Sequence, residues 1–222
     1  NMLGTGRVNA YRMLSEQNVQ PFLKLDLTSF NTIDANGNEI NEPGEIITLN
    51  FDLHNYAPCY GADNVNVSIT TEDPDIGIIN GTTTINIPPD SSFSILEQLQ
   101  IQVSANASCH FADLTLHFES DLQITMGQDI NVKLLVNPSG IFVYEGQENA
   151  QDYSGTFIAS FLDHLGYDYT YSNTYISLKG FETVFMSNGN FGQNLDKGTP
   201  FIQSNSTAVQ HFLESGGKLY VE

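Results

Sequence analysis

Apolar and polar residues alternate with a period of two across most of residues 22–136. Leu23, Leu25 and Leu27 begin the pattern, which recurs at residues 47–53, 99–103, 114–118 and 130–136. Strict alternation is typical of strands with one buried face. Turn sequences separate the runs, namely Asn36-Gly37, Pro43-Gly44, Asp73-Pro74, Asn80-Gly81 and Pro88-Pro89. About seven strands so spaced predict an all-β sandwich. We expect an inward row of Ile47, Leu49, Phe51, Leu116, Phe118 and Val132, with Asn50 and His117 facing outward.

The pattern changes after residue 137. Residues 141–144 form a continuous apolar run, as in a strand covered on both faces. Apolar residues at helical spacing then extend from Tyr153 to Leu165, and Gly166 provides a stop. An extended segment at 167–171, a strand at 184–186, a second helix and a strand at 219–221 follow. This β-α-β-β-α-β order predicts a parallel α/β layer.

The first residues carry a different signal. The stretch Gly4-Thr5-Gly6-Arg7-Val8-Asn9-Ala10 leads into a short basic helix. It resembles the end of the catalytic domain in subtilisin-like serine peptidases, where Gly-x-Gly-Arg-x-Asn-Ala opens the last helix. The resemblance implies that residues 1–20 are the remnant of such a domain and that the catalytic serine is not in this chain. The alternative is an ordinary N-terminal helix after a glycine turn.

Two further resemblances divide the rest of the chain. Asn36-Gly37-Asn38, followed by Glu42-Pro43-Gly44-Glu45 and a strand ending at Asn55, resembles the immunoglobulin-like modules behind catalytic domains of secreted bacterial peptidases. His164-Leu165-Gly166-Tyr167 and residues 213–219 resemble flavodoxin-like or amidotransferase-like domains. We therefore expect an immunoglobulin-like β-sandwich over residues 21–137 and a flavodoxin-like α/β domain, truncated, over residues 138–222.

Charge and composition limit the partners. The formal net charge is -19, from 26 acidic residues against 7 Lys and Arg. Such a surface repels phosphate backbones, so nucleic acid is not expected as a partner. No run approaches the roughly 18 apolar residues that span a bilayer, so membrane insertion is not expected. Few Lys and Arg beside abundant Asn, Ser, Thr and Gly favour a secreted or cell-surface bacterial protein.

Cys59 and Cys109 leave the question of a disulfide open. In an immunoglobulin-like sandwich their loops would lie at opposite ends, whereas a bridge needs Cα atoms within about 7 Å. This disfavours a bridge. Two cysteines are also too few for a zinc site, and no histidine lies at ligand spacing beside them.

One candidate binding loop follows the strand at residues 184–186. Ligands of α/β domains bind beyond the carboxyl ends of the parallel strands, which points to Ser187, Asn188 and Asn190. The chain has no Gly-x-Ser-x-Gly elbow and no Gly-x-Gly-x-x-Gly fingerprint after its first parallel strand. An amidotransferase would also want a cysteine here. A structural turn is therefore the main alternative, with a degenerate binding site as the other.

A candidate calcium loop lies within the sandwich. Asp34, Asn36 and Asn38 place oxygen ligands at every second position, as calcium loops do. The simpler interpretation is an Asn-Gly turn between strands. No other cofactor is expected. Each of the five histidines has a structural explanation, so no catalytic residue is recognised in this chain.

These observations favour a non-catalytic accessory region of a secreted subtilisin-like serine endopeptidase. Such a region would support or space the protease, with the upstream catalytic domain of the same polypeptide as its partner and protein substrates as further contacts. A rival hypothesis is a cell-surface module that binds glycan or host protein through Tyr167, Tyr169, Tyr171 and Tyr175. A third is an amidotransferase-like enzyme.

Overall fold

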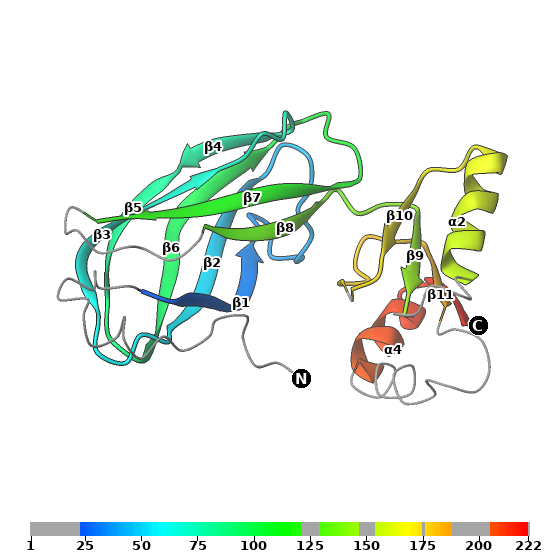
Figure 1. Cartoon of the computed structure of the whole chain (residues 1–222). Coiled ribbons are helices and arrows are strands. Elements are labelled where there is room, and N and C mark those ends of the chain that lie inside the picture. The colour runs from blue at the N-terminus through cyan, green and yellow to red at the C-terminus, as the bar shows by residue number, and fades with distance from the viewer. Residues whose placement is uncertain (1–22, 121–128, 147–153, 175, 188–204, 222) are drawn as a thin grey trace.

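Two four-stranded antiparallel sheets pack face to face where alternation predicts a sandwich (Figure 1). The first sheet has the order β1-β2-β6-β4, with bounds Leu25–Ile33, Ile46–Asn55, Ser91–Val103 and Ile76–Asn80. The second has the order β5-β3-β7-β8, with bounds Thr82–Ile87, Ala62–Thr70, His110–Glu119 and Ile130–Val136. This computed structural model describes residues 23–120, 129–146, 154–174, 176–187 and 205–221.

The strand order is that of an immunoglobulin-like sandwich. Sheets of this class have the strand orders ABED and CFG. The order β1-β2-β6-β4 corresponds to ABED, and β3-β7-β8 corresponds to CFG with β5 added at its edge. The predicted all-β sandwich is therefore confirmed.

The sandwich core follows the predicted inward row. Ile47, Leu49, Phe51 and Leu116 are fully buried, and Phe118 and Val132 are 8% and 6% exposed. The rings of Phe51 and Phe30 stack with centroids 5.0 Å apart. The register inferred from alternation is thus confirmed for these strands.

Two local features depart from the sequence prediction. Among the described residues the sandwich has eight strands, because β4 and β5 lie on either side of Gly81 and join opposite sheets. In addition, Asn50 is buried, although it was expected to be exposed. Leu49 and Phe51 both face the core, so alternation leaves Asn50 on the outer face of the sheet, where β2 and β6 shift register and the N–H of Glu97 donates to its side chain.

The second unit is a small parallel sheet with two described helices. Its strands have the order β10-β9-β11-β12, with bounds Tyr169–Ser172, Ile141–Glu145, Thr183–Ser187 and Lys218–Val221. All three pairings are parallel, as predicted. The connecting helices are α2 (Ser154–Leu165) and α4 (Ser206–Glu214).

The two helices cover opposite faces of this sheet. Val209 and Phe212 of α4 pack with Phe142, Val184 and Met186. The intervening strand residues face α2, because successive side chains alternate across a strand. Figure 1 shows α2 and α4 on either side of the strands.

A four-residue connection, Asn137 to Gly140, joins β8 to β9. The Asn137 backbone N–H donates to the carbonyl of Asn41 at 2.8 Å, and its side chain donates to the carbonyl of Ala107 at 2.8 Å. On the far side, the N–H of Glu182 donates to the carbonyl of Gly140 at 2.8 Å. The connection is therefore hydrogen-bonded to residues of both the sandwich and the α/β unit.

Both cysteines carry free thiols. Among the described helices, none combines the length and hydrophobicity needed to cross a bilayer.

Candidate functional site

Ser187 lies where the sequence predicts, at the carboxyl end of β11, but its side chain is completely buried. Its hydroxyl donates to Glu145 Oε1 at 3.2 Å. Because that hydrogen is committed to the carboxylate, Ser187 accepts its hydrogen bond from the Ser154 hydroxyl at the start of α2. Asn188 and Asn190 lie outside the described residues.

Glu145 is the centre of this arrangement, and the sequence analysis did not single it out. Its side chain is 1% exposed at the carboxyl end of β9. Its Oε2 accepts the backbone N–H of Gly155 at 2.8 Å, so the carboxylate lies at the positive end of the α2 dipole. A Cβ at Gly155 would lie 2.6 Å from Oε2, so a larger residue there would displace the Glu145 carboxylate.

This cluster has the features of a structural hydrogen-bond network rather than of a reactive centre. A serine nucleophile needs an adjacent base and access to substrate. Here the Ser187 hydroxyl donates to a carboxylate, but both side chains are buried, so a substrate has no access to them. The hydrogen bonds join the start of α2 to the ends of β9 and β11. The geometry therefore favours a structural role for Ser187.

In the loop that begins at Asp34, side-chain oxygens accept hydrogen bonds from the backbone of the same loop. Asp34 accepts the backbone N–H groups of Asn38 and Glu39 at 2.8 and 3.2 Å. The side-chain oxygens of Asn36 and Asn38 accept backbone N–H groups two residues further on. Burial acts to raise the pKa of Asp34, but these backbone hydrogen bonds, foremost that of Asn38, bring the pKa below its ordinary value.

The three proposed calcium ligands thus serve as acceptors for the loop itself. The Asn36 amide donates to Glu42 and Glu45, each at 2.7 Å, which closes the loop further. Such side-chain to backbone bonds are the mark of Asx turns. The calcium hypothesis remains a prediction, and the hydrogen bonding favours the alternative turn.

A cluster that the sequence analysis missed joins the two sheets of the sandwich. Asp73 and Asp75 lie in the connection between β3 and β4, and His110 is the first residue of β7. His110 Nε2 lies 2.9 Å from Asp73 Oδ2. Burial acts to lower the pKa of His110, but hydrogen bonds to Ser108 and Asp73, with the nearby charge of Asp75, raise it above its ordinary value. The sequence signal was weak, since these residues lie far apart along the chain.

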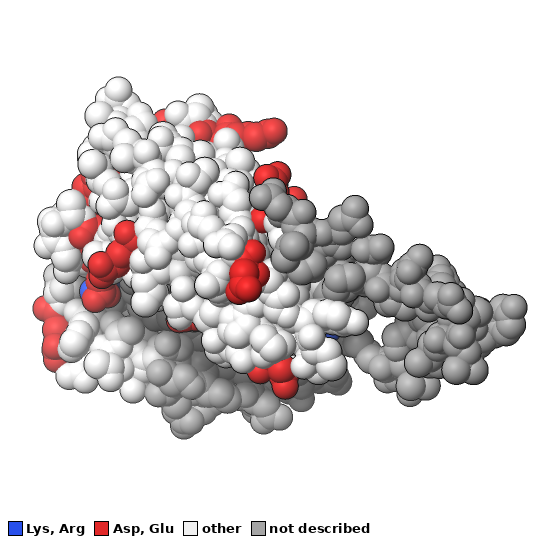
Figure 2. All heavy atoms as spheres, turned by 90° about the vertical axis from the view of Figure 1, so that its left-hand side faces the viewer, with Lys and Arg blue, Asp and Glu red and all other residues white. Residues whose placement is uncertain are grey.

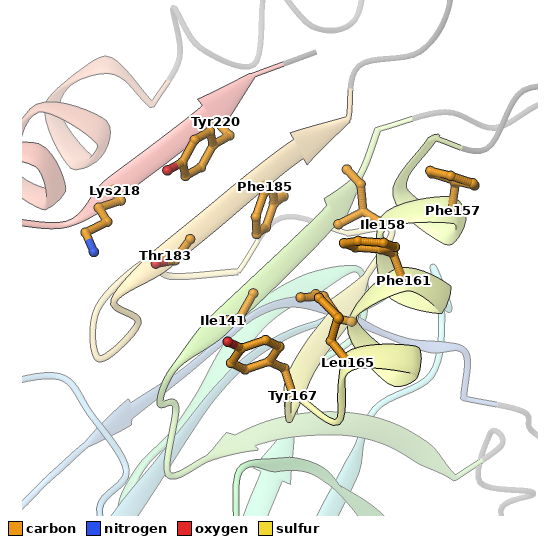
Figure 3. Close-up of a pocket in the computed structure, with 11 residues that line it drawn as sticks. Ile141, Phe157, Ile158, Phe161, Leu165, Tyr167, Thr183, Phe185, Lys218 and Tyr220 are labelled. Atoms are coloured by element: carbon orange, nitrogen blue, oxygen red, sulfur yellow. The ribbon is translucent and has the colours of Figure 1, made fainter.

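An apolar hollow of about 420 Å³ lies between α2 and the adjoining face of the parallel sheet (Figure 3). Phe157, Phe161 and Leu165 of α2 line one side of it. Phe185 and Tyr220, whose stacked rings have centroids 5.1 Å apart, line the sheet. Phe157 is 73% exposed and Tyr220 is 55% exposed, so this face is open to solvent.

The tyrosines proposed as a binding cluster do not all line the hollow. Tyr167 lines the hollow and is exposed. The Tyr169 hydroxyl instead donates to Asp163 at 3.1 Å, and the Tyr171 hydroxyl lies 3.3 Å from that of Thr156. Burial, with the hydrogen bond and charge of Asp163, raises the pKa of Tyr169. Tyr175 lies outside the described residues.

Comparisons with known proteins leave the family open. No protein-family model matches the chain, and no curated protein matches it. Among solved structures, Escherichia coli alpha-2-macroglobulin, from domain MG7 to its C-terminus, is 11% identical with a TM-score of 0.40, over 55% of this chain and 18% of that one. A Paenibacillus cycloisomaltooligosaccharide glucanotransferase is 13% identical with a TM-score of 0.33, over 88% and 27%.

A conjugative transposon lipoprotein from Bacteroides eggerthii is 10% identical with a TM-score of 0.27, over 52% of this chain and 96% of that one. The chain spans less than a third of the macroglobulin fragment and of the glucanotransferase. At these identities and TM-scores, the similarities carry no inference about what this chain binds or catalyses.

Proposed function

We propose that this chain is a non-catalytic accessory region of a secreted subtilisin-like serine endopeptidase. In this proposal the sandwich holds the α/β unit in a fixed orientation, and thereby spaces it from the catalytic domain and the protein substrate. The observation that supports it is the joint between the two units.

The joint combines a short connection with direct contacts. Four residues span at most about 14 Å, so β8 and β9 begin close together. Cys109 Sγ lies 2.8 Å from Thr170 Oγ1, and Cys109 and Leu135 of the sandwich pack against the apolar core of the α/β unit. Packed apolar contacts and a paired backbone resist rotation, whereas a flexible tether would have neither.

A surface ion pair between the two units adds little to their fixed orientation. Lys179 Nζ lies 2.5 Å from Glu39 Oε2, with both side chains about half exposed or more. Exposed pairs of this kind typically contribute about 0 to 1 kcal/mol. The orientation therefore depends on the connection and the packed contacts.

The strand order supports the finer class proposed for the α/β unit. In chain order, β10-β9-β11-β12 is second, first, third, fourth. This is the beginning of the flavodoxin-like order 2-1-3-4-5 among doubly wound folds. We therefore propose this class for residues 138–222.

The parent enzyme is proposed from residues 4–14, which lie outside the described part of the chain. Secretion is proposed from composition, since the chain combines few Lys and Arg with abundant Asn, Ser, Thr and Gly. Figure 2 adds that Asp and Glu side chains are spread over one face of the sandwich.

Scattering in solution tests the fixed orientation. Small-angle X-ray scattering of the whole chain should fit one elongated particle with a narrow distribution of interdomain distances. Limited proteolysis should spare the connection between Val136 and Ile141. A broad distance distribution, or rapid cleavage there into two separating halves, would contradict the proposal.

A labelling experiment tests the absence of catalysis. A serine-reactive fluorophosphonate should label no serine of the folded chain, because Ser187 is buried and the probe has no access to it. Specific labelling that is lost on denaturation would favour the enzyme hypothesis, including the amidotransferase-like one.

The apolar hollow supports a second candidate, a surface module that binds an amphipathic helix of a protein partner. Faces of parallel sheets are ordinarily covered by helices, and α4 covers the opposite face of this sheet. Beside α2, exposed aromatic rings leave room for a helix laid in a groove. Tyr167 belongs to this surface, whereas the hydroxyls of Tyr169 and Tyr171 hydrogen-bond to side chains of α2.

A dye experiment tests whether this face is an open binding surface. An apolar fluorophore such as ANS should bind the folded chain, and Phe157→Ser with Phe161→Ser should abolish the signal at unchanged melting temperature. Glu72→Ser, at a distant exposed site, is the control. An unchanged signal in the double variant would remove this candidate.

A further inference from the structure

The cluster of Asp73, Asp75 and His110 has the composition and geometry of a metal site. One ligand atom from each residue can be chosen so that all three lie within 4.8 Å of one another. A zinc ion about 2.0 to 2.2 Å from each ligand would hold them about 3.4 Å apart. Only a small adjustment of the side chains separates this arrangement from a coordinated one.

The imidazole is oriented for coordination. His110 Nδ1 lies 2.9 Å from the backbone carbonyl of Ser108, which can only accept, so Nδ1 carries a hydrogen. Nε2 is therefore the nitrogen that faces the carboxylates. It donates to Asp73 Oδ2 at 2.9 Å, and a metal ion would take the place of the hydrogen in this bond. A backbone carbonyl that fixes the ring in this way is the usual outer partner of a metal-bound histidine.

The Asp73 carboxylate is also held in place. The backbone N–H of Asp75 donates to Asp73 Oδ1 at 2.9 Å, which leaves Oδ2 facing His110. The N–H of Asp73 donates to Thr71 Oγ1, whose hydroxyl donates to the carbonyl of Asp113 on β7. The loop is thus attached to the strand that carries the histidine, and Asp73 and His110 are positioned before any ion arrives, with Asp75 beside them.

We propose that Asp73, Asp75 and His110 bind one divalent transition-metal ion of the zinc type, with water completing the coordination. Imidazole with carboxylates suits zinc, whereas calcium prefers oxygen ligands alone. The acidic surface, with a net charge of -19, favours the approach of cations. The ion would join the β3–β4 connection to β7, and so link the two sheets at this end of the sandwich.

Two other histidines show why this cluster differs. His117 Nδ1 lies 2.9 Å from Asp129, and its Nε2 lies 2.8 Å from the Thr70 hydroxyl. His54 Nε2 lies 3.8 Å from Asp90. Each has one carboxylate beside it, and within the described residues only the Asp73 cluster gathers three such ligands. His117 therefore provides a matched control.

Calorimetric titration of the whole chain with zinc chloride, after removal of metal by chelator, tests the site. One equivalent of zinc should bind and raise the melting temperature. His110→Ala and Asp75→Asn should each weaken binding by about tenfold or more. His117→Ala should bind zinc as the unaltered chain does. Calcium chloride should bind the site more weakly than zinc.

Several outcomes would overturn the proposal. These are binding of less than one equivalent, equal affinity in His110→Ala and Asp75→Asn, or loss of binding in Cys109→Ser, which would assign the ion to the neighbouring thiol. Circular dichroism checks that each variant is folded. If His110→Ala does not fold, Asp75→Asn, which keeps the size of the side chain, decides the question.

Discussion

Asn50 on β2 accepts a hydrogen bond from the backbone N–H of Glu97 on β6, at 2.9 Å. Glu97 has a positive φ of 57°, and the two strands shift register at this point. The Asn50 amide also donates to the Asn31 side chain on β1 at 3.3 Å. One buried side chain therefore bonds to both neighbouring strands of the first sheet.

Asn50→Ala should destabilise the sandwich by about 1 to 3 kcal/mol, because it leaves the N–H of Glu97 without this partner at a buried position. His117→Ala, at a partly exposed site, should cost about 0.5 kcal/mol or less. Urea denaturation of both variants measures the difference. Equal losses would mean that water replaces Asn50 as the acceptor.

Phe51→Ala and Phe118→Ala should each lower the free energy of unfolding by about 3 to 5 kcal/mol, the usual cost of emptying a buried phenylalanine site. Phe157→Ala is the matched control, since Phe157 is exposed, and should cost about 0.5 kcal/mol or less. Denaturant titrations followed by far-ultraviolet circular dichroism compare the three. A large loss in Phe157→Ala would show that its ring is covered in solution.

Gly180→Ala should loosen the joint between the units. Gly180 has a φ of +85°, and a Cβ there would lie 2.6 Å from the Pro138 carbonyl oxygen and 2.9 Å from its Cγ. Gly37→Ala is the control, because Gly37 has a φ of +75° but nothing within 4 Å of the added carbon.

Both substitutions carry the backbone cost of a positive φ. Only Gly180→Ala should speed proteolysis between Val136 and Ile141 and widen the distance distribution in scattering. Equal behaviour of the two variants would show that the contact with Pro138 does not hold the joint.

Acid should weaken the sandwich through Asp52. Hydrogen bonds from Ser94 at 2.6 Å and Ser29 at 2.7 Å bring the pKa of Asp52 below its ordinary value of 3.8, against a smaller effect of burial. A carboxyl whose pKa is lower in the folded state contributes stability above its unfolded pKa, and this is lost as the pH falls through the folded pKa.

Ser29→Ala with Ser94→Ala should return the pKa of Asp52 toward 3.8 and remove its contribution to the loss of stability below that pH. Carboxyl chemical shifts in an NMR titration report the pKa, and denaturation at several pH values reports the stability. Unchanged titration of Asp52 in the double variant would contradict the assignment.

Residue patterns predicted the sandwich and the parallel sheet well, because burial of one face imposes alternation on each strand. They missed β4, whose sequence Ile-Gly-Ile-Ile-Asn does not alternate and whose residues after Ile76 are exposed. They also missed the burial of Asn50, since the register shift that accompanies it depends on the partner strand and cannot be deduced from β2 alone.

Candidate sites were harder to predict for the same reason. The position of Ser187 at a strand end follows from the α/β pattern, but its burial depends on Glu145 and Gly155, which come from another strand and a helix. Asp73 and His110 meet only through pairing of β3 with β7. Contacts between distant segments determine both sites.

The passage of the chain from β4 to β5 through Gly81 has a consequence for how the sandwich unfolds. The N–H of Ile69, on β3, donates to the carbonyl of Gly81 at 2.8 Å, while β4 is paired with β6 in the other sheet. One short stretch of backbone therefore belongs to the hydrogen-bond ladders of both sheets. Opening either ladder strains the other, so the two sheets should melt together as one cooperative unit.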